Sequence, residues 1–103
     1  MGLLDHEISQ VDGAATLVLA GELDLSVADE LRSLLDAYVR DHSPRIRVDL
    51  AGVRFIDSRT IGVLIGAQKR AEAAGGGLRV TNPQPTVRKA FDILGLSPVF
   101  EIN

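Results

Sequence analysis

The chain has 103 residues, of which 46% are hydrophobic and 24% are charged, and its formal net charge is −3. This length supports one domain with its own core, so we predict a single domain over residues 1–103. The absence of cysteine excludes disulfides and thiolate metal sites, and two histidines far apart offer little for another metal site, so we expect no metal and no cofactor.

Charge distribution and hydropathy argue against two further classes of protein. Acidic and basic residues are interspersed, without the basic stripe that nucleic-acid binding requires. No apolar run approaches the roughly 20 residues of a membrane span, and the first ten residues lack the pattern of a secretory signal. We therefore expect a cytoplasmic protein that contacts neither nucleic acid nor the membrane interior.

The first part of the chain predicts two strands and a helix. Residues 3–10 and 14–20 are short runs of strand formers joined by a turn, which is typical of a strand pair. Ser26 is followed three residues later by Asp29, a pattern that resembles a capping box with a shorter acid. Apolar residues then recur at helical spacing, which predicts a helix over about 27–41 with Ser26 as its N-cap.

The rest of the chain alternates between the two-residue period of a strand and the helical period. Glycines and prolines separate these segments. The predicted elements are a strand over 45–50, an extended segment over 53–57, a helix over 58–74, a strand over 78–81, a helix over 85–95 and a short apolar tail over 96–102 that forms a last strand or a turn.

Strands that alternate with helices imply parallel pairing through right-handed crossovers, here with an antiparallel strand at the leading edge. The fold class is therefore predicted as α/β, a single-layer mixed β-sheet of four to five strands. Because so short a chain has few helices, we expect them to pack mainly on one face of the sheet.

The most informative stretch is the polar cluster 57–60, Asp-Ser-Arg-Thr, which lies between two apolar blocks at a strand-to-helix junction. Such a junction exposes backbone N–H groups at a helix N-terminus, and these groups favour anions. A hydroxyl at this place is a good site for a phosphate, whose charge of about −1.5 to −2 the helix dipole would stabilise. The plainer interpretation is that Asp57 or Ser58 is simply the N-cap.

Several segments together resemble one known family, the STAS domain, which is the fold of bacterial anti-sigma factor antagonists and related modules. The resemblance covers practically the whole chain. Its segments are GELD at 21–24, VDLAGV at 48–53, FIDS at 55–58, AAGG at 73–76 and LRVTNP at 78–83.

The resemblance implies a partner-switching mechanism. Family members bind an anti-sigma factor, usually one with a histidine-kinase-like ATPase fold, and thereby free the sigma factor. The anti-sigma factor in turn phosphorylates a serine or threonine at the start of the second helix. The resemblance also implies that Asp24 and Asp57 help to shape the docking surface, although each has an ordinary role as a loop or capping residue.

The chain departs from the family pattern at the phosphoacceptor. Arg59 stands where the second hydroxyl is usual, Thr60 stands where a small residue is common, and Ser58 matches the first, normally unmodified serine. The kinase could use Ser58 or Thr60 instead, the protein could be an antagonist that always binds, or Arg59 could recognise a carboxylate or phosphate on a different partner. The remaining alternative is that Arg59 is an exposed surface arginine with no functional role.

The candidate site is therefore a partner-binding surface made of Asp24, Asp57, Ser58, Arg59 and Thr60, with Ser58 and Thr60 as candidate phosphorylation sites. A second hypothesis keeps the fold but makes the chain a STAS regulatory subunit of a lipid-transport ATPase or a stress-signalling complex. An enzyme is not expected, because Ser58 has no histidine or lysine base in a recognisable motif. A weak homodimer through a strand edge stays open.

Overall fold

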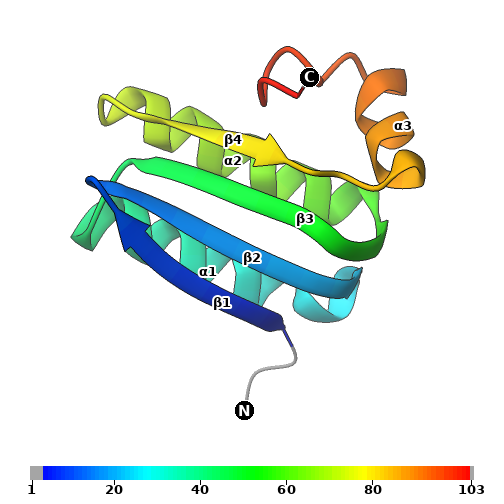
Figure 1. Cartoon of the computed structure of the whole chain (residues 1–103), viewed down its shortest axis with the longest axis horizontal. Helices are drawn as coiled ribbons and strands as arrows, with labels where there is room; N and C mark the ends of the chain where they lie inside the picture. Colours follow the sequence, from blue (N-terminus) through cyan, green and yellow to red (C-terminus); the bar gives the residue numbers. More distant parts are fainter. Residues whose placement is uncertain (1–3, 103) are drawn as a thin grey trace.

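The computed structural model describes residues 4–102, so residue 3 of the first predicted strand lies outside the described part. One four-stranded sheet and three helices make up the fold (Figure 1). In chain order the elements are β1 (Asp5–Val11), β2 (Ala14–Leu23), α1 (Leu25–Asp41), β3 (Arg45–Ile56), α2 (Ser58–Ala73), β4 (Gly77–Thr81) and α3 (Pro85–Ile93).

The sheet has the strand order β1-β2-β3-β4 and mixes both kinds of pairing. The leading pair β1 and β2 is antiparallel, whereas β2 pairs with β3, and β3 with β4, in parallel. Helices α1 and α2 form the crossovers between the parallel strands. The predicted α/β class with an antiparallel leading edge is confirmed.

Helices α1 and α2 cover the same face of the sheet, and α3 lies beyond the end of β4 (Figure 1). Alternate strand residues point toward α1 and α2 because successive side chains of a strand face opposite sides. These inward residues are nearly free of solvent and include Leu17, Leu19, Ile46, Val48, Leu50, Leu78 and Val80. The helices add Leu31, Leu35, Leu64 and Ala67 to the same core, in which each large aliphatic side chain contributes about 1.5–3 kcal/mol.

The largest difference from the predicted element boundaries is at β3. The segments predicted over 45–50 and 53–57 are one strand, β3, because β2 runs on to Leu23 and gives the second segment a parallel partner. An irregularity in register between Val18 and Ala20 accommodates the extra length of β3 around Gly52.

Helix α1 begins at Leu25, so the prediction that Ser26 caps it is wrong. Asp24 is the N-cap: its backbone is extended, and its carboxylate accepts a hydrogen bond of 2.9 Å from the N–H of Ser26. Ser26 already lies inside the first turn, where its hydroxyl donates to the same carboxylate. Both residue types cap well, and the end of β2 at Leu23 places the aspartate at the capping position.

The predicted tail 96–102 forms turns and no strand. Phe100 is fully buried and packs edge-to-face against Phe91 of α3, with ring centroids 5.4 Å apart. Its carbonyl accepts a hydrogen bond of 3.0 Å from the N–H of Val80 in β4. The tail therefore ties α3 to the edge of the sheet.

Candidate functional site

The parallel pairing of β2 and β3 brings two helix N-termini side by side. Leu23 and Ile56 are paired at the ends of these strands, and each is followed directly by an aspartate that caps the next helix. Asp24 thus caps α1 beside Asp57, which caps α2. This edge of the sheet gathers the sequence-predicted residues of the candidate site.

Asp57 is the N-cap of α2, and Ser58 is not. The Asp57 carboxylate accepts a hydrogen bond of 2.8 Å from the N–H of Thr60, and its own N–H donates to the Leu23 carbonyl at 3.0 Å. The side chain of Asp57 is therefore committed to the start of the helix while remaining partly exposed.

Thr60 lies in the core. Its side chain is fully buried, and its hydroxyl donates a hydrogen bond of 3.1 Å to the Leu23 carbonyl. A kinase or partner cannot reach this hydroxyl without opening the first turn of α2. This burial disagrees with the prediction that Thr60 belongs to the partner-binding surface and is a candidate phosphorylation site, because a carbonyl from β2 draws its side chain inward.

Ser58 is exposed and is the first residue of α2. Its hydroxyl makes no hydrogen bond with any other part of residues 4–102. No acidic residue lies in the first turn of this helix. The hydroxyl is therefore a free group at the positive end of a helix dipole, where added negative charge is stabilised.

Arg59 reaches from α2 across to α1. Its guanidinium donates to the carboxylate of Asp29 at 3.3 Å, and the two side chains are 51% and 80% exposed. An exposed pair of this kind contributes about 0–1 kcal/mol, which is comparable with the cost of a cation at a helix N-terminus. Sequence reasoning missed this structural role because Asp29 is 30 residues away.

Asp24 is held as an anion. The hydrogen bonds donated by the Ser26 hydroxyl and the Ser26 N–H lower the pKa of its carboxyl group below the ordinary value. The two caps and Ser58 thus form a small polar surface with fixed negative charge at Asp24.

Two exposed apolar side chains lie close in sequence to these polar residues and were missed by the sequence analysis. Leu25 follows Asp24 and is 63% exposed, and Phe55 precedes Asp57 by two residues and is 50% exposed. A phenylalanine at an outward position of a strand is the signal that could have revealed Phe55. Aromatic side chains and arginines, here Phe55 and Arg59, are enriched at protein-binding surfaces.

Within residues 4–102 no helix is both long and apolar enough to cross a bilayer, and no group of three or more histidine, aspartate or glutamate side chains is arranged to hold a metal ion.

The family model described as "Mlab, STAS domain" matches residues 6–101. The chain therefore belongs to the STAS domain family, as its sequence segments suggested.

Individual relatives agree with this assignment. The chain is 33% identical over 81 residues to an anti-sigma F factor antagonist of Lysinibacillus sphaericus. This alignment covers 78% of this chain and 69% of the relative. It is 29% identical over 100 residues to an anti-sigma-B factor antagonist of Bacillus subtilis (strain 168), covering 97% of this chain and 91% of the relative.

The fold also matches solved structures. The anti-sigma factor antagonist SpoIIAA in its unphosphorylated form superposes with a TM-score of 0.83 at 28% identity, over 92% of this chain and 84% of SpoIIAA. The phosphorylated form of the Bacillus cell fate determinant SpoIIAA superposes with a TM-score of 0.76 at 27% identity, over 92% of this chain and 87% of that one.

Proposed function

We propose that this chain is an anti-sigma factor antagonist, which binds an anti-sigma factor and so releases a sigma factor. Its similarity to antagonists named as such extends over nearly all of both chains, and this is the observation that carries the proposal. The binding surface is the paired helix N-termini, with Asp24, Asp57, Ser58 and Arg59 as contact residues. The function would place the protein in the cytoplasm, where sigma factors act.

The partner in this proposal has a histidine-kinase-like ATPase fold, and binding is uncoupled from phosphorylation. Arg59 occupies the position at which the family resemblance expects the phosphoacceptor, and arginine has no hydroxyl. Thr60 is sealed in the core by its bond to Leu23. Ser58 is thus the one hydroxyl of the tetrapeptide within reach of a kinase, and it stands at the position that is normally left unmodified.

The test mixes the purified chain with the kinase-like anti-sigma factors of its source genome, with and without ATP and Mg²⁺. We expect a complex by size-exclusion chromatography and no added phosphate by intact-mass measurement. Arg59→Ser, which restores a hydroxyl at this position, should gain one phosphate and lose affinity once modified, because a dianion would then lie within the interface. Ser58→Ala is the matched control and should behave like the parent chain.

Phosphorylation of the unaltered chain that disappears in Ser58→Ala would overturn the uncoupled mechanism while leaving antagonist function intact. Absence of a complex with every such anti-sigma factor would count against antagonist function itself.

A STAS regulatory subunit of a lipid-transport ATPase is the second candidate, because the family model that matches residues 6–101 carries the description "Mlab, STAS domain". Purified ATPase subunits from the same genome should then form the stable complex, and the anti-sigma factors should not.

A further inference from the structure

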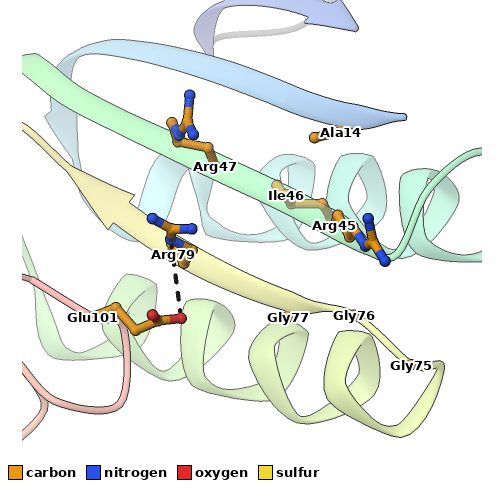
Figure 2. Close-up of a pocket in the computed structure, with 9 residues that line it drawn as sticks. All are labelled: Ala14, Arg45, Ile46, Arg47, Gly75, Gly76, Gly77, Arg79 and Glu101. Atoms are coloured by element: carbon orange, nitrogen blue, oxygen red, sulfur yellow. Dashed lines mark ion pairs between the residues drawn. The ribbon is translucent and has the colours of Figure 1, made fainter. Parts of the chain in front are cut away.

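The face of the sheet opposite α1 and α2 carries a cluster of arginines on adjoining strands. Arg47 of β3 is paired with Arg79 of β4, and Arg45 is paired with Gly77. Ile46, Val48, Leu78 and Val80 alternate with these residues and point into the core, so the three arginines share the outer face. Figure 2 shows the three side chains on the two neighbouring strands.

This arrangement has an electrostatic cost, and within residues 4–102 only the contact of Arg79 with Glu101 reduces it. Like charges directly opposite each other destabilise a sheet. Arg45 and Arg47 form no ion pair within residues 4–102, and Arg79 has only a long contact of 4.0 Å to the exposed carboxylate of Glu101. Because the chain as a whole is acidic, the cluster is not a by-product of a basic composition.

Apart from Glu101, the carboxylates on the same face either bind other partners or lie far from the arginines. Asp49, the next outward residue of β3, accepts hydrogen bonds from the N–H of Ala51 at 2.9 Å and from the Asn82 amide at 3.2 Å. Asp5 and Glu7 lie on β1, two strands away from Arg47. The guanidinium groups therefore remain available to a ligand.

The arginines border an open hollow of about 300 Å³, at the lower end of the size range of small-molecule sites. The glycine segment 75–77 also lines this hollow (Figure 2). A side chain at Gly76 would meet the Pro44 carbonyl at 2.2 Å, so this segment is bare backbone. The three glycine N–H groups are already bonded within the fold, which leaves the guanidinium groups as donors to a ligand.

We propose that this hollow binds the phosphate group of a small molecule through Arg45, Arg47 and Arg79. Planar guanidinium forks match the oxygens of phosphate, and an anion between Arg47 and Arg79 would relieve their repulsion. The carboxylate of Glu101, which also lines the hollow, would repel such a ligand. The hollow lies at the start of β3, roughly 30 Å along the strand from Asp57, so it is separate from the candidate partner surface.

The experiment titrates inorganic pyrophosphate into the ¹⁵N-labelled full chain and follows amide shifts and calorimetric heats. We expect shifts confined to residues 45–47, 75–79 and 101. Arg47→Gln/Arg79→Gln should weaken binding about tenfold or more, whereas Arg32→Gln/Arg54→Gln, which removes the same charge elsewhere, should change it less than about twofold. Glu101→Gln should tighten binding up to about fivefold, an effect that a purely structural role would not produce.

A second arm adds vesicles of phosphatidylcholine with and without phosphatidic acid, and a third measures oligomeric state by sedimentation. The proposal predicts pyrophosphate binding without vesicle binding. It is overturned by the absence of shifts with pyrophosphate, by shifts centred on Ser58, by binding to vesicles alone, or by a dimer that needs the arginines and does not respond to pyrophosphate.

Discussion

The side-chain hydroxyl of Thr60 donates a hydrogen bond of 3.1 Å to the backbone carbonyl of Leu23, which lies 37 residues earlier in the chain. The same carbonyl accepts the N–H of Asp57 at 3.0 Å. One oxygen atom at the end of β2 therefore holds both the cap and the first turn of α2. This contact fixes how the candidate site is presented at the surface.

Thr60→Val should lower the free energy of unfolding by about 1 kcal/mol, because it removes a buried hydrogen bond with little change in side-chain volume. Urea denaturation measures the difference. The matched control is Ser58→Ala, which removes an exposed hydroxyl without a partner and should stay within about 0.5 kcal/mol of the parent. Equal stability of the two variants would show that the Thr60 bond contributes nothing.

Asp57→Ala should destabilise the fold by about 1 kcal/mol, within the range of about 0.5–2 kcal/mol for the loss of a helix cap. Asp57→Asn retains an oxygen that can accept from the N–H of Thr60, so it should recover most of this loss. If both substitutions cost the same, the charge of Asp57 and not its capping bond would be the stabilising feature. Thermal and urea unfolding monitored by circular dichroism give the values.

The Arg59–Asp29 ion pair predicts unequal changes in stability when each of its two partners is replaced. Arg59→Ser loses a pair worth about 0–1 kcal/mol but also removes a cation from the first turn of α2, so its stability should change by less than about 0.5 kcal/mol. Asp29→Asn loses the pair and leaves the cation in place, so it should be the less stable variant. The reverse order, measured by urea denaturation at low salt, would contradict this account of Arg59.

Asp24 predicts a pH dependence of stability. Its pKa is lowered in the folded protein by the hydrogen bonds from Ser26, so its contribution is present above the unfolded-state pKa of about 4 and is lost as the pH falls through the folded pKa. Asp24→Asn still caps α1 but does not titrate. The parent chain should therefore lose stability more steeply below about pH 4 than the variant, and parallel curves would rule out this contribution.

Replacement by alanine should lower the free energy of unfolding by different amounts at Gly76 and at Gly75. At Gly76 a Cβ atom would lie 2.2 Å from the Pro44 carbonyl oxygen, so Gly76→Ala should cost about 3 kcal/mol or reduce the yield of folded protein. At Gly75 the Cβ would meet open space, and only the positive φ of 93° is unfavourable. Gly75→Ala should therefore cost about 1–2 kcal/mol. A smaller loss at Gly76 than at Gly75 would be inconsistent with the close approach.

Local patterns identified the elements of the fold and their order. The alternation of Ile46, Val48 and Leu50 has the period of a strand, and these residues do face the core. The polar cluster between two apolar blocks correctly marked the start of α2. Periodicity and capping preference act over a few residues, so one sequence is enough to read them.

The boundaries of the elements depended on more distant residues. Both Asp24 and Ser26 are good caps, and the choice between them was made by the end of the pairing between β2 and β3. The two segments of β3 likewise became one strand only because β2 continues beside them. Strand pairing is a property of two segments, so neither segment alone contains it.

The sequence by itself determined a mixed α/β fold of the STAS family and a polar junction at residues 57–60. Only the tertiary structure decided that Thr60 is buried, that Arg59 pairs with Asp29 and that Arg47 stands opposite Arg79. Each of these outcomes joins residues about 30 or more positions apart. They follow from the register of parallel strands and the packing of α1 beside α2, which local preferences do not specify.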